Sequence, residues 1–104
     1  MYRMTILYGT PEDPNGFRDY YYRQHIPLAA KMSGLTGWNL SWIDQDSAEP
    51  SPYILIAELY TRTREAMDEM LASPAGAAAR ADLDNFVTGS VAFLRGYEEE
   101  VEIA

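Results

Sequence analysis

One stretch of eight residues, 53–60, limits the possible folds more than any other part of the chain. It reads Tyr-Ile-Leu-Ile-Ala-Glu-Leu-Tyr and is apolar at nearly every position. A strand with one face in water alternates polar with apolar side chains, whereas this run is typical of a central strand covered on both faces. We therefore expect a sheet in which residues 53–60 lie in the interior.

Other segments suggest how the sheet around this run is completed. Residues 2–8 are rich in β-forming side chains and stop at a Gly-Thr-Pro sequence, and residues 38–43 alternate apolar with polar side chains. A last strand lies within residues 90–101, and residues 44–52 read as a hairpin loop. The order strand, helix, strand, strand, helix, strand predicts one α+β domain over residues 1–104. Its fold would be ferredoxin-like βαββαβ, a four-stranded antiparallel sheet with two helices on one face.

The first helical region follows a turn-rich loop over residues 9–16. Asp13 or Asn15 can cap it, because both side chains accept hydrogen bonds from helix N–H groups. Pro27 lacks an N–H and clashes with the preceding turn. We therefore expect a break there, followed by a short second helix to about residue 32.

The second helical region has a similar two-part pattern. Thr61 or Thr63 can cap a helix to about residue 72. Ser73 followed by Pro74 is a restart signal, and the alanine-rich residues 75–81 favour a further short helix. Residues 82–89 are expected to form a loop that carries Phe86.

The second face of such a sheet has no helix to cover it. The strands nevertheless place apolar side chains on both faces. A large exposed apolar face is a sign of an interaction surface. A second copy packing sheet to sheet is the simplest cover, so we expect a homodimer.

Composition excludes several classes of partner and of chemistry. Acidic residues outnumber basic ones by 16 to 8, a net charge of −8, which disfavours binding to nucleic acid and to anionic membranes. The chain has no cysteine, so disulfides and thiolate nucleophiles are excluded. No apolar run is long enough to cross a membrane, and the chain begins directly with strand-like sequence. We expect no signal peptide and a cytoplasmic location.

The stretch over residues 17–28 holds the single histidine, His25, and reads Phe-Arg-Asp-Tyr-Tyr-Tyr-Arg-Gln-His-Ile-Pro-Leu. At about 100° per residue, His25 falls at the edge of an apolar stripe made by Phe17, Tyr20, Tyr21, Gln24 and Leu28. With an unperturbed pKa of about 6.5, imidazole can give or take a proton near neutral pH. A structural or surface role is the alternative. One histidine without cysteine cannot form a zinc site of three nitrogen or sulfur ligands, so we expect no metal.

Aromatic residues are numerous for a chain of 104 residues. They can line a pocket for a flat, apolar ligand, with tyrosine hydroxyls as hydrogen-bond donors. Ordinary packing in the core and in a dimer interface is the alternative. The residues concerned are Tyr8, Tyr20, Tyr21, Tyr22, Trp38, Trp42, Tyr53, Tyr60, Phe86 and Phe93.

The chain resembles the EthD family of the dimeric α+β barrel superfamily over essentially its whole length. The motifs that carry the resemblance are Leu7-Tyr8, Phe17-x-x-Tyr20-Tyr21, His25-x-Pro27-Leu28, residues 53–60 and Asp84-Asn85-Phe86. The resemblance implies a protomer that dimerises through its sheets into a closed barrel. It also implies a pocket between sheet and helices, near His25. The superfamily includes cofactor-free monooxygenases, isomerases, dehydratases and stress proteins.

These observations together suggest a small enzyme that works without a cofactor on an aromatic or polyketide-like hydrophobic molecule. His25 would move a proton next to a carbonyl or hydroxyl group, giving isomerisation, cyclisation or dehydration. Tyr21 would orient the imidazole or stabilise oxyanion charge. The side chains expected to contact the substrate are Tyr8, Phe17, Tyr20, Leu28, Trp38, Tyr60 and Phe86. The alternatives are a cofactor-independent monooxygenase and a non-catalytic protein that binds hydrophobic ligands or serves in stress.

Overall fold

A four-stranded antiparallel sheet forms the centre of the protein, seen here in a computed structural model that describes residues 1–46, 48 and 50–104. The strands are β1 (Tyr2–Gly9), β2 (Gly37–Trp42), β3 (Tyr53–Thr61) and β4 (Val91–Tyr97), arranged in the order β2-β3-β1-β4. β3 therefore lies in the interior, as its apolar sequence predicted. The predicted loop over residues 44–52 joins β2 to β3, although residues 47 and 49 lie outside the described residues.

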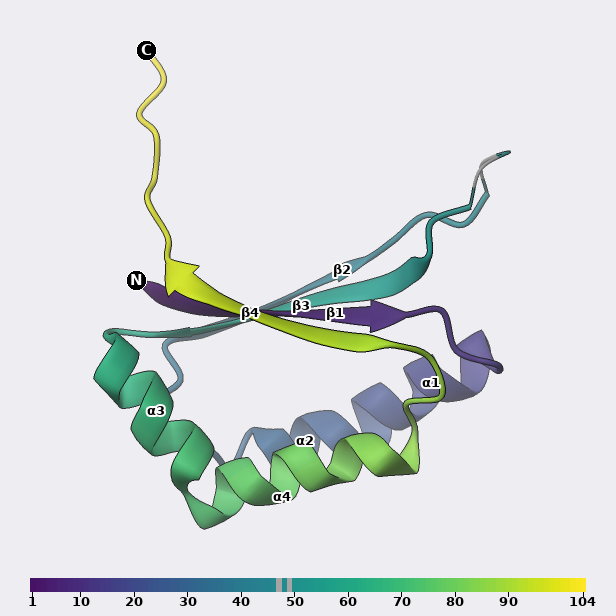
Figure 1. The fold of residues 1–104 in the computed structure, drawn as a ribbon, viewed down its shortest axis with the longest axis horizontal. Coiled ribbons are helices and arrows are strands. Elements are labelled where there is room, and N and C mark those ends of the chain that lie inside the picture. The colour runs from purple at the N-terminus through teal and green to yellow at the C-terminus, as the bar shows by residue number, and fades with distance from the viewer. Residues whose placement is uncertain (47, 49) are drawn as a thin grey trace.

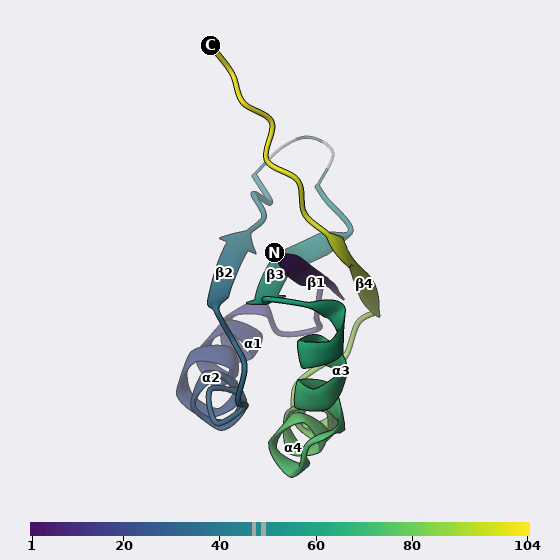
Figure 2. The ribbon, with the colours of Figure 1, turned by 90° about the vertical axis from the view of Figure 1, so that its left-hand side faces the viewer.

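The helices all lie on one face of this sheet (Figures 1 and 2). α1 (Pro14–Tyr20), a π-helical segment η1 (Tyr21–His25) and α2 (Ile26–Ala29) make one arm. α3 (Arg64–Ala72), α4 (Pro74–Asp82) and the short 3₁₀ turn η2 (Leu83–Asn85) make the other. Figure 2, turned by 90° from the view of Figure 1, shows the two arms side by side beneath the sheet. This arrangement confirms the ferredoxin-like βαββαβ fold.

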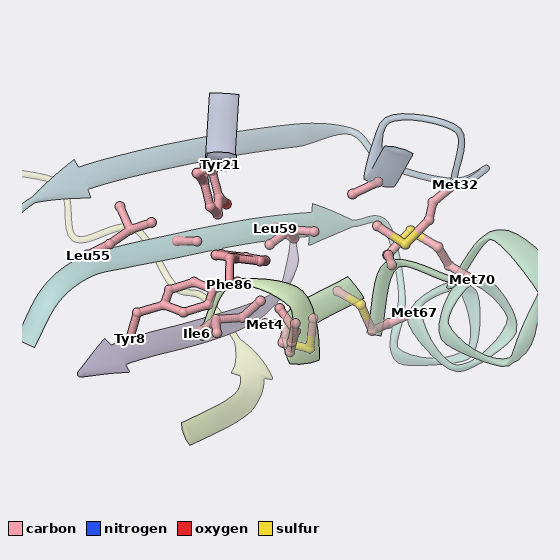
Figure 3. Packing of buried hydrophobic residues seen from close by; sticks show 14 of the residues in the cluster. Met4, Ile6, Tyr8, Tyr21, Met32, Leu55, Leu59, Met67, Met70 and Phe86 are labelled. Atoms are coloured by element: carbon pink, nitrogen blue, oxygen red, sulfur yellow. The ribbon is translucent and has the colours of Figure 1, made fainter. Parts of the chain in front are cut away.

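The core fills the space between the sheet and the helical arms. Alternate residues of β1 point into it, because side chains of a strand alternate between its two faces. They meet the inward side chains of β3 and the buried faces of the helices. Figure 3 shows Tyr8, Tyr21 and Phe86 toward one end of this core and three methionines, Met32, Met67 and Met70, toward the other.

The helix break predicted at Pro27 is wrong. His25 and Ile26 both have right-handed helical backbone angles, and α1, η1 and α2 follow one another without interruption. The N–H of Ile26 bonds to the carbonyl of Tyr21, five residues back, which makes one wide π-helical turn. A widened turn accommodates the proline ring, which would clash with the carbonyl four residues back in a regular helix. The prediction of a short helix after Pro27 is confirmed in part, since α2 ends at Ala29.

The wide turn also changes which side chains face the core. The buried residues of this arm are Phe17, Tyr21, His25 and Ala29, which are spaced four apart. In a regular helix, four residues advance by about 40° beyond a full turn, so such a row would drift round the surface. The predicted positions of Gln24 and Leu28 on the buried face are therefore wrong. Gln24 is exposed, Leu28 is half-buried, and His25 points inward rather than lying at the edge.

The structure shows which of the predicted capping residues cap the helices. Asp13 caps α1 by accepting a hydrogen bond from the N–H of Gly16. Thr63 caps α3 through the N–H of Ala66, and Ser73 both ends α3 and caps α4 through the N–H of Gly76. These three bonds are each 3.1 Å long.

The loop predicted over residues 82–89 begins later than expected. Asp82 is the last residue of α4, and the chain continues through the 3₁₀ turn to Asn85. Helical geometry holds the Asp82 side chain inward, where it is 7% exposed. Within the described part of the chain, no helix is long and apolar enough to cross a membrane.

Candidate active site

A cavity of about 280 Å³ lies between the inner face of the sheet and the helices. Its size is close to the lower end of the range for small-molecule sites. The walls are mostly apolar, with side chains that include Met4, Ile6, Met32, Leu59, Leu71 and Leu83. Polar groups enter it from both layers, namely Tyr8, Tyr21, His25, Trp38, Arg80 and Arg95.

His25 is paired with a buried carboxylate. Its Nδ1 atom lies 2.9 Å from Oδ2 of Asp82, and the two side chains are 6% and 7% exposed. The two residues come from different helical arms, His25 from η1 and Asp82 from the last position of α4. The pair thus connects the arms across the core.

Two further side chains hold Asp82 in place. The Tyr20 hydroxyl donates a hydrogen bond of 2.7 Å to Oδ1, and the Asn85 amide donates one of 2.9 Å to the same atom. Burial by itself raises the pKa of Asp82, but the hydrogen bonds from Asn85, Tyr20 and His25 together lower that pKa below its ordinary value of 3.8. Asp82 is therefore a carboxylate at neutral pH and can only accept hydrogen bonds.

The charge of Asp82 fixes the proton arrangement on His25. An ionised carboxylate requires a donor, so Nδ1 carries the hydrogen and Nε2 of a neutral imidazole carries the lone pair. His25 lines the cavity, and Nε2 has no hydrogen-bond partner among the described residues. The ring packs against Tyr21 and Phe86, with centroids 5.2 and 5.0 Å away. The site therefore offers an oriented proton acceptor to a ligand in the cavity.

A second group of polar atoms lies in the cavity wall on the sheet side. The Tyr8 hydroxyl and the Trp38 indole N–H are buried without a hydrogen-bond partner among the described residues. Burial raises the pKa of Tyr8 and also that of Tyr21. Both tyrosines therefore stay protonated at neutral pH. An unmade hydrogen bond of a buried group costs about 1–3 kcal/mol, so a ligand oxygen placed here would be stabilised.

The structure brings only part of the predicted contact set to the cavity. Of the seven predicted contacts, Tyr8 and Trp38 line it, and so do the two residues predicted to be catalytic, His25 and Tyr21. Phe17 and Phe86 are buried and pack against Tyr8, with ring centroids 5.5 and 6.3 Å away, so they support the wall from behind.

The other three predicted contacts lie elsewhere. Tyr20 bonds Asp82, and the half-buried Leu28 is not among the described residues that line the cavity. Tyr60 donates a hydrogen bond to Glu98 on the far side of the sheet. Asp82 holds the imidazole directly through a hydrogen bond, and the ring of Tyr21 packs beside it.

Asp82 is the site residue that sequence reasoning missed. The sequence pattern places it in a loop, where an exposed acid has no special meaning. One weak signal was present, because Asp82 directly follows the predicted helix over residues 75–81, and the helix dipole disfavours an acidic side chain near a helix C-terminus. Arg80, a further cavity residue, was missed because an exposed arginine on an alanine-rich helix gives no signal. Within residues 1–46, 48 and 50–104, no cluster of three potential metal-ligating side chains is present.

Comparisons with known proteins agree with this fold. The EthD domain model matches residues 10–90. The uncharacterized 11.0 kDa protein in the thcB-thcC intergenic region of Rhodococcus erythropolis is 37% identical over 102 residues, which cover 97% of this chain and 98% of that protein.

Several solved structures have a fold similar to that of this chain. An EthD family protein from Bacillus halodurans superposes with a TM-score of 0.88 at 26% identity, over 95% of this chain and 99% of that one. A mutant of SnoaB, a cofactor-independent oxygenase from Streptomyces nogalater, gives a TM-score of 0.65 at 15% identity, over 97% of each chain. The fold is thus shared with dimeric α+β barrel proteins, a cofactor-free oxygenase among them. From its match to the family model and its identity with the Rhodococcus protein, the chain belongs to the EthD domain family.

Proposed function

We propose that the protein is an enzyme that transfers a proton by general acid–base catalysis on an aromatic or polyketide-like hydrophobic molecule. The observation that carries the proposal is the buried Asp82–His25 pair, which leaves Nε2 as a proton acceptor in a mostly apolar cavity. A buried pair of titratable side chains that is oriented by hydrogen bonds and lines a cleft is typical of functional sites.

In the proposed reaction, Nε2 of His25 takes a proton from the carbon next to a carbonyl group, or from a hydroxyl. Asp82 stabilises the imidazolium that forms, because its carboxylate accepts the Nδ1 hydrogen bond. Negative charge that develops on the substrate oxygen is stabilised by hydrogen-bond donors in the wall, namely the Tyr8 hydroxyl, the Trp38 N–H and the Tyr21 hydroxyl. Return of the proton to a different carbon or oxygen atom gives isomerisation. Transfer of the proton from the imidazolium to a leaving hydroxyl group, which departs as water, gives dehydration.

Deuterium exchange tests this proposal even while the final product is unidentified. The native protein is incubated in D₂O with a panel of aromatic and polyketide-like ketones and phenols, and mass spectrometry follows deuterium uptake next to the carbonyl. For a compound that exchanges, we expect His25→Ala to lower the rate by about 10²–10⁴-fold, the usual contribution of a general base. Asp82→Asn should lower it as well, because the carboxylate no longer stabilises the imidazolium.

The matched control is Gln24→Ala, an exposed neighbour of His25 on the same turn. It should leave the exchange rate unchanged. Circular dichroism verifies that each variant is folded. An exchange rate that survives His25→Ala in a folded protein would contradict the proposal.

A cofactor-independent oxygenase is the second candidate. It is favoured by the same proton acceptor, since removal of a phenol proton produces an electron-rich anion that can react with oxygen. The likeness to SnoaB supports the fold needed for this alternative. Product formed under strict anaerobiosis rules it out. Saturable binding without any chemical change would instead favour a binding or stress protein.

A further inference from the structure

We infer that the ligand of this cavity carries an anionic group, which binds to Arg80. The inference rests on the proposed function in one respect only, namely that the same cavity holds the ligand. It narrows the ligand class to apolar aromatic acids, such as carboxylates.

Two guanidinium groups line the cavity, and they differ in their surroundings. Arg95 forms a salt bridge with Asp68, so its charge is already balanced. Arg80 has no carboxylate partner within salt-bridge distance among residues 1–46, 48 and 50–104. Its charge is therefore available to a ligand.

The position of Arg80 is defined by an aromatic side chain of the cavity wall. Its guanidinium carbon lies 4.3 Å from the ring centroid of Phe93, which also lines the cavity. Stacking on an aromatic face holds the planar guanidinium while leaving its N–H edge to bind an anion. The guanidinium matches a carboxylate through two parallel hydrogen bonds.

The negative charge of the whole chain makes a cation without a carboxylate partner at the cavity unusual. With a net charge of −8, the surface repels anions in general. The Arg80 guanidinium, which has no carboxylate partner in the described part of the chain, thus attracts anions locally where the molecule as a whole repels them. A solvated surface arginine is the plain alternative, and it predicts no preference for charged ligands.

α4 contributes a residue to the anion site and a residue to the site of the proton acceptor. It supplies Arg80 to the cavity and, two residues later, Asp82 to His25. A ligand held by its acidic group at Arg80 and by its apolar body between sheet and helices would present a further atom to Nε2. Arg80 would therefore select the substrate and set its direction in the cavity.

The test compares two fluorescent probes that share an anilinonaphthalene body. One, 8-anilinonaphthalene-1-sulfonate, is an anion, and the other, N-phenyl-1-naphthylamine, is neutral. Dissociation constants are measured by fluorescence titration for the native protein and for Arg80→Gln. The NMR signals of the single imidazole report whether each probe occupies the cavity next to His25.

We expect the native protein to bind the anionic probe about tenfold or more tightly than the neutral one, with a shift of the imidazole signals. One charge-assisted hydrogen bond is sufficient for such a ratio. Arg80→Gln should abolish the preference and leave the neutral probe unaffected. Arg62→Gln, which removes the same charge from an exposed residue outside the cavity lining, should preserve it.

Several results would overturn the inference. These are equal affinities of the native protein for the two probes, no binding of the anionic probe, and an equal effect of Arg62→Gln. Failure of this inference can be distinguished from failure of the proton-transfer proposal. Deuterium exchange that occurs only on neutral compounds would contradict the anion site and support the catalytic proposal. A preference for the anionic probe without any deuterium exchange would support the anion site and contradict the catalytic proposal.

Discussion

At the scale of single residues, the site depends on a carboxylate that the sequence did not reveal. His25 was recognisable because imidazole is scarce and titrates near neutral pH. The environment of His25 was not recognisable, because Asp82 is 57 residues away along the chain and contacts His25 only when the two helical arms pack together. A long-range pair of this kind depends on tertiary packing, which local sequence patterns do not encode.

Tyr8 allows a prediction about alkaline pH. Burial raises its folded-state pKa above the ordinary value of 10, while the unfolded chain titrates near that value. Above pH 10 the unfolded state therefore loses a proton that the folded state keeps, and the free energy of unfolding falls. Each such tyrosine contributes a slope of about 1.4 kcal/mol per pH unit. Urea unfolding of Tyr8→Phe should show a slope that is shallower by this amount.

Two comparisons make this measurement specific. Tyr21→Phe should reduce the slope in the same direction, because burial raises the pKa of Tyr21 as well. Near neutral pH, Tyr8→Phe should not be less stable than the native protein, since the hydroxyl that it removes has no hydrogen-bond partner among the described residues. Parallel stability curves of the native protein and Tyr8→Phe above pH 10 would refute the assignment.

At the scale of elements, the strands and caps could be predicted and the first helical arm could not. Strand ends and capping residues such as Thr63 and Ser73 are marked by local chemistry, and they lie where expected. The π-helical turn at Tyr21–His25 has no comparable local signal. It forms where Pro27 and the burial of Tyr21 and His25 must be accommodated together. Sequence periodicity assumes regular turns, so it misplaced Gln24 and His25.

The prediction at the scale of elements concerns the corner between α3 and α4. A Cβ added at Gly76 would lie 2.2 Å from the carbonyl oxygen of Met70 and 2.7 Å from that of Leu71. α4 would have to move away from α3, and the cavity wall would move with it. We expect Gly76→Ala to lower the free energy of unfolding by about 1–3 kcal/mol, as overpacking does. Urea denaturation measures the change.

The control for this prediction is another glycine-to-alanine change. At Gly96 an added Cβ meets no atom of the described residues within 4 Å, so Gly96→Ala should alter stability little. Equal stability of the two variants would show that the corner has room for a side chain, against the packing argument.

At the scale of the whole molecule, the two faces of the sheet have different surroundings. The helices cover one face, and no helix of the described residues lies over the other (Figure 1). On that open face Leu7 lies between its partners Ile56 and Ala92, and Leu94 nearby is 51% exposed. Exposed apolar side chains of this kind are typical of a contact surface. They support the homodimer that the barrel family implies.

Leu94→Glu tests the dimer through this face. The substitution places a carboxylate from each copy in an apolar contact that excludes water, where an unpaired charge is strongly disfavoured. We expect the native protein to sediment as a dimer and Leu94→Glu as a monomer in analytical ultracentrifugation. Ala77→Glu, on the exposed surface of α4, introduces the same charge on the helical side and should remain dimeric. A dimeric Leu94→Glu would place the contact elsewhere.

The π-helical turn also affects how the family can diverge. Such a turn holds one residue more than the regular helix it interrupts. Deletion of a single codon within residues 21–25 would restore the regular helix and rotate the rest of the arm by about 100°, so the imidazole or its neighbours would lose their places. Gaps of one residue in alignments of relatives should therefore separate members that keep the histidine–carboxylate pair from members that retain only the barrel.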